Sequence, residues 1–274
     1  MTYIELLKRI DALAPLPKTV LDIEEFKKTD NYDTNDLVKI IEQDPLMVST
    51  ILKTANSAMF GFVSKIDSLN KAVALLGINF TISIALASGI KNATNSQLVV
   101  YGGDSDIFLR IANMQSNFVS LWMNQVDAEL KKELILPSFL QESGKFLINN
   151  AVMDEGKKDD FLKQINEKYD DISAVEKEFV GMNSADVTAA IFKHWNIAQS
   201  ITNSIKYSDD VSKAPPQYEK HAKILNIVKL VCNIFKPLDE RCIALARQRV
   251  QEFGFDLQPF DTAVAKMKSR VSEE

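Results

Sequence analysis

The spacing of its apolar residues constrains this chain more than any other feature. Along most of the sequence, apolar side chains recur every three or four residues, which is the period of an amphipathic α-helix. Beyond Pro45, for example, Ile51 and Ala55 would lie on one helix face. Only 9 of the 274 residues are glycine, and no convincing strand pattern is present. The sequence therefore predicts an all-α fold, and its 46% hydrophobic content is ample for a large core.

Breaks in the helical pattern suggest how the chain is divided. Helices are predicted after Thr34, after Asp44-Pro45, and over residues 69–76, 80–90, 107–126, 134–152, 159–169, 185–194, 198–205, 218–235, 238–253 and 259–271. The polar stretch 93–105 contains Gly102-Gly103 and is the predicted joint. It would separate an N-terminal helical sub-domain, residues 1–100, from a larger helical sub-domain, residues 101–274. Residues 208–217 form a second predicted connection.

The charge pattern argues against a nucleic-acid-binding protein. The formal net charge is −5 and the pI is near 5.3, whereas proteins that grip nucleic acid by its phosphates carry a clustered basic surface. Here the basic residues come as scattered pairs with acidic neighbours. The two cysteines, Cys232 and Cys242, are too few for a structural zinc site on their own and are predicted to be small buried side chains.

Residues 72–90 carry no charge and are nearly long enough to cross a bilayer. Several small and polar residues dilute this stretch, and Gly77 falls where a helical pattern ends. We therefore expect two buried helices that meet near Gly77, with no insertion into a membrane. The first residues are interrupted by charge too early for a signal peptide, so the expected location is the cytoplasm.

The sequence carries few patterns typical of catalysis. The two histidines, His194 and His221, lie far apart in the sequence and form no pair with a neighbouring acid. We interpret His194 as an ordinary residue near a helix end and His221 as exposed. No glycine-rich phosphate loop is present. Adjacent carboxylates point in different directions on a helix, and all such pairs are interpreted as solvated surface: Glu24-Glu25, Asp159-Asp160, Asp170-Asp171, Asp209-Asp210 and Glu273-Glu274.

A series of short motifs in the first third of the chain resembles the HDOD family, the HD-related output domains of bacterial signalling proteins. The motif residues that carry this resemblance are Asp44, Pro45, Asn56, Ser57, Phe60, Gly61 and Gly77. Each also has a plain structural role. Asn56, for instance, could bond local carbonyls or adopt a left-handed backbone where a helix ends. Their order and spacing are specific, although each motif alone is weak.

The second half resembles HD metal phosphohydrolases without their metal ligands. Gln115 and Gln141 stand where the resemblance places histidines, and Glu142 stands where it places an aspartate. Ser184 replaces a further histidine, two residues before Asp186. Trp195 matches the tryptophan that follows, and Ala198 replaces a proline. Because amides are poor substitutes for imidazole, the resemblance implies no metal, no cofactor and no HD-type hydrolysis.

Three functions follow from these observations. The leading interpretation is a non-catalytic regulatory module that acts by binding another signalling protein or a small ligand. The second is an enzyme with a rebuilt site, in which Gln115, Gln141, Glu142 and Asp186 meet and hold magnesium loosely. The third is a sensor of nucleotides or cyclic dinucleotides, which would need arginines for the phosphates. Arg241, Arg247 and Arg249 lie together near the C-terminus, but we interpret them as solvated surface.

Overall fold

A computed structural model describes residues 2–28, 33–57, 60, 62, 64–94, 97–103 and 106–272. The prediction of an all-α fold is confirmed, because the described residues contain helices and no strand. The elements are α1 (Tyr3–Asp11), α2 (Lys18–Phe26), α3 (Thr34–Glu42), α4 (Pro45–Ala55), α5 (Leu69–Leu76), α6 (Ile78–Thr94), η2 (Val99–Tyr101), α7 (Ile107–Met123), α8 (Ala128–Leu140), α9 (Lys145–Asp154), α10 (Lys158–Glu167), α11 (Ile172–Val180), α12 (Ser184–His194), α13 (Gln199–Lys206), η3 (Val211–Lys213), α14 (Pro216–Val231), α15 (Glu240–Glu252) and α16 (Leu257–Ser272).

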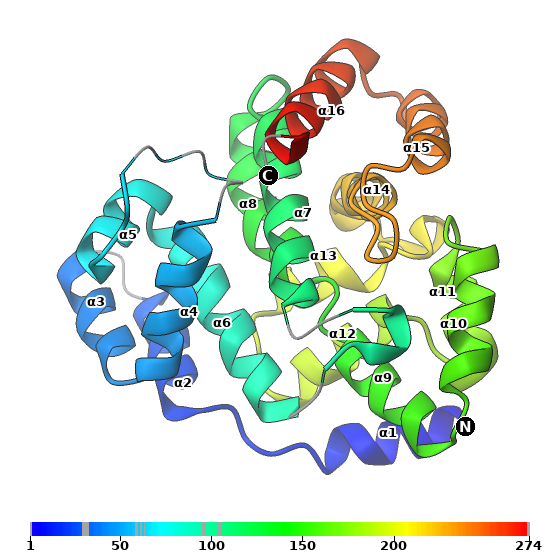
Figure 1. The fold of residues 1–274 in the computed structure, drawn as a ribbon, viewed down its shortest axis with the longest axis horizontal. Coiled ribbons are helices and arrows are strands. Elements are labelled where there is room, and N and C mark those ends of the chain that lie inside the picture. The colour runs from blue at the N-terminus through cyan, green and yellow to red at the C-terminus, as the bar shows by residue number, and fades with distance from the viewer. Residues whose placement is uncertain are drawn as a thin grey trace.

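The helices form two groups joined by α6. Helices α2 to α5 gather on one side of the molecule, and α6 runs from them into the larger group (Figure 1). Helix α6 packs against α4 on one side and α8 on the other, and most of its side chains are buried. The first helix, α1, packs instead on α9 and α12 of the larger group. The predicted division at residue 100 stays a prediction.

Local sequence explains where α4 to α6 begin and end. The Asp44 carboxylate accepts the backbone N–H groups of Leu46 and Met47, each at 3.0 Å, and Pro45 occupies the first turn of α4. Helix α5 ends at Gly77, whose φ of 83° and ψ of 158° are essentially restricted to glycine. As a result, the chain bends by 117° between α5 and α6. In the described part of the chain, no single helix has the length and apolarity to cross a bilayer, and only this bent pair matches by length and composition.

The motif residue Asn56 closes the segment that follows α4. Its side-chain amide donates to the carbonyls of Leu52 and Ile66, both at 2.7 Å, and its Oδ1 accepts the backbone N–H of Ile66 at 2.9 Å. The backbone of Asn56 is not left-handed, since its φ is −88°. The predicted bond to a local carbonyl is present, but no sequence pattern indicated the link to Ile66. Asn56 is thus a determinant of the fold.

Other motif residues tie the two groups of helices together. Phe60 packs edge-on against Phe80 of α6, which in turn packs edge-on against Phe139 of α8. Trp195 is buried, and its indole N–H donates to the carbonyl of Ala14 at 2.9 Å, which anchors the segment between α1 and α2. The Ser57 hydroxyl is buried with no hydrogen bond among the described residues. Gly61 lies outside the described residues.

Several sequence predictions about local structure are wrong. The single helix expected over 134–152 is two helices, α8 and α9, separated by the turn 141–144. Helices α1, α2 and α11 are not predicted. In α11, the central Glu-Lys-Glu interrupts the apolar pattern. The expected polar joint 93–105 contains the buried residues Leu98, Val100 and Tyr101, because η2 packs on α9 and α10.

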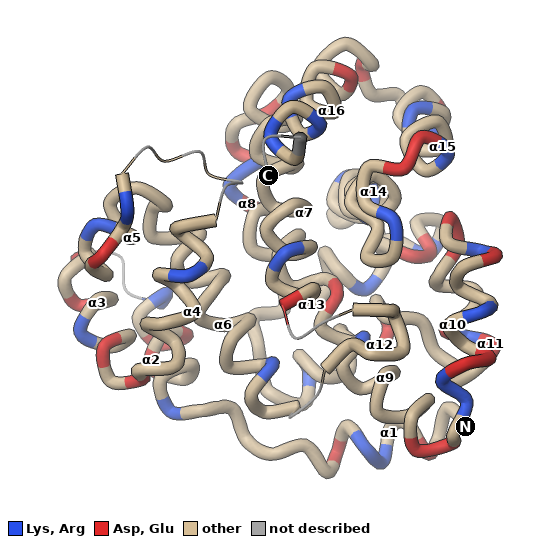
Figure 2. The backbone as a smooth tube through the Cα atoms, in the orientation of Figure 1, with Lys and Arg blue, Asp and Glu red and all other residues tan. Residues whose placement is uncertain are grey.

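The structure also tests the predictions made for the histidines, the cysteines and the surface charges. His194 is exposed at the end of α12, as expected for a helix-end residue. The prediction that His221 is exposed is wrong, since only 15% of its side chain is, and its Nε2 lies 2.9 Å from Glu133 Oε2. Cys232 and Cys242 are buried and free, as predicted. In the view of Figure 2, the described acidic and basic residues are interspersed along the outer helices. The pair Glu273-Glu274 lies outside the described residues.

Candidate functional site

The turn between α8 and α9 brings three predicted site residues together. Gln115 on α7 donates from Nε2 to Glu142 Oε1 at 2.9 Å and to the Cys232 carbonyl at 3.2 Å. Gln141 donates from its own Nε2 to Gln115 Oε1, also at 2.9 Å. All three side chains are buried. The positions that resemble a metal site therefore form a chain of side-chain hydrogen bonds.

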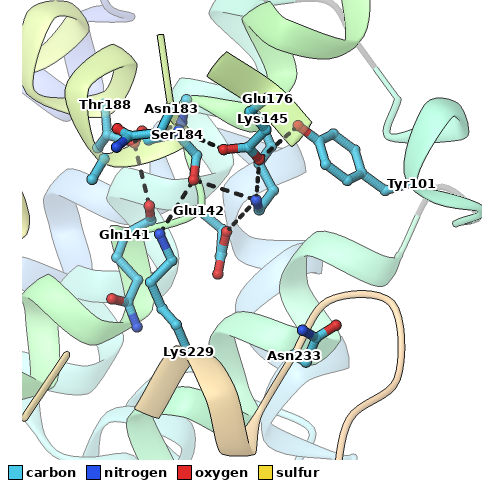
Figure 3. Close-up of polar contacts among 12 residues, drawn as sticks. Tyr101, Gln141, Glu142, Lys145, Glu176, Asn183, Ser184, Thr188, Lys229 and Asn233 are labelled. Atoms are coloured by element: carbon cyan, nitrogen blue, oxygen red, sulfur yellow. Dashed lines mark hydrogen bonds and ion pairs between the residues drawn. The ribbon is translucent and has the colours of Figure 1, made fainter. Parts of the chain in front are cut away.

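A buried lysine that no sequence pattern indicated lies next to this chain. Lys145, on the first turn of α9, has its Nζ 3.2 Å from Glu142 Oε2 and in direct contact with Glu176 Oε1 of α11. Only 3% of its side chain is exposed. Glu142 Oε1 therefore accepts a hydrogen bond from Gln115, whereas Oε2 lies in an ion pair with Lys145 and accepts no hydrogen bond from the described residues (Figure 3).

Ser184 joins the buried lysine to a second one. Its hydroxyl oxygen accepts from Lys145 Nζ at 3.3 Å and from Lys229 Nζ of α14 at 3.2 Å (Figure 3). Its backbone N–H donates to Glu176 Oε2 at 2.6 Å. Ser184, which stands where the resemblance places a histidine, therefore lies between two ammonium groups.

The short helix η2, which follows α6, also reaches this cluster. Tyr101 of η2 donates its hydroxyl to Glu176 Oε1 at 3.0 Å, and Lys145 Nζ lies 4.8 Å from the centre of its ring. The backbone N–H of Val100 donates to Asn149 Oδ1 at 3.0 Å. These two hydrogen bonds hold η2 against the buried cluster.

Burial and neighbouring charges shift the pKa values of Lys145 and Tyr101. Burial alone would lower the pKa of Lys145, but the carboxylates of Glu142 and Glu176 outweigh it and raise that pKa above its ordinary value. Burial and the Glu176 carboxylate both raise the pKa of Tyr101 well above its usual range. Lys145 is consequently charged and Tyr101 neutral at physiological pH.

Asp209 corrects the prediction that adjacent carboxylates are solvated. Only 6% of its side chain is exposed, and its Oδ1 lies 2.6 Å from Lys229 Nζ. Its Oδ2 accepts the backbone N–H of Ala185 at 3.2 Å. Burial alone would raise the pKa of Asp209, but the Lys229 ammonium outweighs it and holds that pKa below its ordinary value. The neighbouring Asp210 is a surface residue paired with Lys213.

This pair predicts a pH-dependent contribution to stability. Because the pKa of Asp209 is lower in the folded chain than the unfolded value of about 3.9, the pair stabilises the fold fully above that pH. The contribution is lost as the pH falls through the folded pKa. Asp209→Asn should therefore cost about 2 kcal/mol at pH 7 and progressively less below pH ~4 in urea-unfolding measurements. Asp210→Asn is the control and should change stability less. A cost that does not depend on pH would contradict this account.

Asp186 stands apart from the other predicted site residues. It is half-buried on the first turn of α12, where its backbone N–H donates to Asn183 Oδ1 at 2.8 Å. Within the described chain, its carboxylate makes no hydrogen bond or ion pair with Gln115, Gln141, Glu142 or Ser184. Burial raises the pKa of Asp186 above its ordinary value. The structure thus brings four of the five predicted residues together.

A pocket of about 310 Å³ opens beside this cluster. Helices α9, α11, α12, α14 and α15 contribute its walls. It lies at the small end of the range for sites that hold small molecules. Its charged and polar lining consists of Glu142, Lys145, Asp170, Asp171, Ser173, Lys177, Ser184, Asp209, Asn226, Lys229, Asn233 and Arg249.

A more open and more apolar groove of about 770 Å³ lies between the two groups of helices. The motif residues Phe60 and Gly77 line it, together with Phe80 of α6 and Ile135 of α8. The groove and the pocket are lined by different residues, so the two hollows are separate.

The donors at the resembling positions do not suit a catalytic metal. Two are neutral amides, which bind divalent transition metals less well than imidazole does. The one carboxylate, Glu142, is already engaged by Gln115 and Lys145. In the part of the chain that the structure describes, no three His, Cys, Asp or Glu side chains gather as metal ligands. The residues present therefore do not fit the metal that HD-type hydrolysis requires.

Four residues complete the site without having been predicted from the sequence: Tyr101, Lys145, Glu176 and Lys229. Lysine and glutamate are usually exposed, and nothing local distinguishes these from surface charges. One signal was available for Lys145. It follows Glu142 by three residues, so both would share a helix face within an otherwise apolar segment.

The comparison with protein families decides what kind of chain this is. Residues 13–211, more than half of the chain, match the model of the HDOD domain. The chain belongs to the HDOD family. A curated relative of this HDOD protein is an uncharacterized protein of Treponema pallidum, 22% identical over 214 residues. That alignment covers 77% of this chain but only 40% of the relative, so the chain spans less than half of the relative's length.

Solved structures with the HDOD-like fold cover nearly the whole chain. A virulence factor from Campylobacter jejuni is 26% identical with a TM-score of 0.57, covering 98% of this chain and 96% of that one. A candidate phosphohydrolase from Shewanella amazonensis is 21% identical with a TM-score of 0.71, covering 97% and 94%. A candidate signal-transduction protein from Marinobacter aquaeolei is 19% identical with a TM-score of 0.70, covering 96% of this chain and 59% of that one. The last two likenesses show the fold alone.

Proposed function

We propose that this HDOD protein is a non-catalytic regulatory module of bacterial signalling, located in the cytoplasm, which acts by binding a small ligand or another signalling protein. Membership of the HDOD family supports the signalling role. The residues at the degenerate site support the absence of hydrolysis.

One observation carries the non-catalytic part of this proposal: the Glu142 carboxylate is already neutralised within the chain. Glu142 is the carboxylate among the positions that resemble metal ligands, its Oε1 accepts a hydrogen bond from Gln115, and its Oε2 pairs with the Lys145 ammonium. A hydrolytic metal would have to displace these donors and would still lack the imidazoles that normally hold it. The hydrogen bonds and the ion pair of these residues join α7 to the turn before α9, which is a structural role.

The test is metal content together with hydrolysis. The purified protein is dialysed against Mn²⁺, Fe²⁺ or Zn²⁺, its metal content is measured, and it is assayed with bis-p-nitrophenyl phosphate and nucleotides. We expect substoichiometric metal. Any hydrolysis that is detected should be the same in the natural sequence and in Glu142→Gln. Glu142→Gln is a suitable control because Lys145 keeps Glu176 as its partner. Stoichiometric metal, with hydrolysis that this variant abolishes, would instead support the rebuilt phosphohydrolase.

The triple variant Gln115→His/Gln141→His/Glu142→Asp provides a positive control. It introduces the imidazoles and the shorter carboxylate of the resembling motif at positions that already touch one another. Metal uptake by this variant but not by the natural sequence would support the view that the lost imidazoles are what prevents binding. Equal uptake by both proteins would count against it.

A further inference from the structure

The pocket beside the degenerate site has an unusual balance between its acidic and basic groups. Four carboxylates and four cationic side chains line it, so the lining has no net charge. The carboxylates, however, are engaged by the chain itself. Glu142 pairs with Lys145, Asp209 pairs with Lys229, Asp170 pairs with Arg241 at 2.6 Å, and Asp171 Oδ1 caps α11 by accepting the backbone N–H of Ala174.

Two of the cations are left without such partners. Arg249 of α15 is half-buried and donates to Asn226 Oδ1, but it forms no ion pair with any described residue. Lys177 of α11 is exposed and also forms no ion pair within the described chain. The two face the pocket from different helices. An arginine offers five donors, so Arg249 has several left for a ligand.

We propose that this pocket binds the phosphate group of a small metabolite, held by Arg249 and Lys177. This inference rests on the proposed function, because it names the ligand class that the module would sense. Arginine matches phosphate oxygens with two parallel N–H groups, and lysine adds a second positive charge. Lys229 also lines the pocket, where its ammonium is paired with Asp209. A pocket of about 310 Å³ admits a phosphate or a nucleoside monophosphate but not a macromolecule.

Arg247 provides a matched control on the same helix. It is exposed, pairs with Asp261 at 2.9 Å, and does not line the pocket. Arg249→Gln removes the guanidinium but keeps an amide, whereas Arg247→Gln makes the same change outside the pocket. Lys177→Gln is the second test variant, because an exposed lysine can be replaced without loss of folding.

The experiment is isothermal titration calorimetry on the full chain with three probes: inorganic phosphate, guanosine 5′-monophosphate and guanosine. We expect at least one phosphate probe to bind and guanosine not to bind. Arg249→Gln should weaken this binding about tenfold or more, since a hydrogen bond to a charged group is lost, while Arg247→Gln leaves it unchanged. Binding of inorganic phosphate would identify the free anion as sufficient, and binding of the nucleotide alone would identify an ester.

Three results would overturn the proposal: no binding of either phosphate probe at millimolar concentration, equal effects of Arg249→Gln and Arg247→Gln, or equal binding of guanosine. If Arg249→Gln fails to fold by circular dichroism, Lys177→Gln decides, and unchanged binding in that variant counts against the site. Failure of the proposed function is separate. Hydrolysis of the bound nucleotide, lost in Glu142→Gln, would overturn the non-catalytic role and leave the phosphate site intact.

Discussion

Lys145→Met is expected to lower the free energy of unfolding by about 3–5 kcal/mol, because it leaves Glu142 and Glu176 as buried carboxylates without their ammonium partner. Methionine has a similar length and fills the same space, so the loss reports charge and not a cavity. Urea unfolding at pH 7, followed by circular dichroism, measures it.

The control for this prediction is an exposed ion pair. Lys132 lies 2.8 Å from Glu129 with 64% of its side chain exposed, so Lys132→Met should change stability little. A second comparison uses Glu176→Gln. In the double variant, removal of one carboxylate should recover part of the loss caused by Lys145→Met, with a coupling of about 1–3 kcal/mol. Simple additivity of the two changes, or an equal loss in Lys132→Met, would show that the buried cluster does not act as a unit.

Gly144→Ala is expected to cost about 3 kcal/mol or more and to distort the pocket. The backbone of Gly144 is helical, with a φ of −62°, so the reason is space and not conformation. A Cβ at this position would lie 2.4 Å from the Ser184 carbonyl oxygen and 2.8 Å from the Thr188 backbone nitrogen. Backbone atoms cannot rotate away, so α9 and α12 would have to separate. The midpoint of thermal unfolding and phosphate binding are the two measurements.

Gly156→Ala is the matched control for Gly144→Ala. Gly156 has a φ of 66°, and a Cβ added there would have no neighbour within 4 Å, so alanine meets only the left-handed backbone penalty of about 1 kcal/mol. It should leave the pocket unchanged. The double variant Gly144→Ala/Thr188→Ala should not recover stability, because the Ser184 carbonyl and the Thr188 backbone nitrogen remain. A full recovery would locate the conflict in the Thr188 hydroxyl instead of the backbone.

Much of the N-terminal architecture follows from local rules. Asp44-Pro45 starts α4, and Gly77 ends α5 with a backbone that other residues rarely adopt. The apolar period places most helices correctly to within a few residues. One exception, at 141–144, has an identifiable cause. This segment reads as helix in sequence but turns in the structure, where Gly144 N–H donates to the Thr188 hydroxyl at 2.8 Å. A contact between distant helices overrides the local preference there.

For the candidate site, the sequence prediction is also correct in part. The motif spacing identified Gln115, Gln141, Glu142 and Ser184 as neighbours, because a resemblance preserves positions even where the residue types differ. It also included Asp186, which lies apart from the other four.

By itself, the sequence determined most of the helices, the ends of α4 and α5 at Asp44 and Gly77, and the replacement of the metal-ligand positions, because these depend on residues close together in the chain. Only the tertiary structure decided which charges are buried. Lys145, Glu176 and Asp209 resemble ordinary surface residues until α9, α11, α12 and α14 meet and remove their side chains from water. The physical reason is that burial of a charge is compensated by partners distant in sequence, and helical period and short motifs carry no information about those partners.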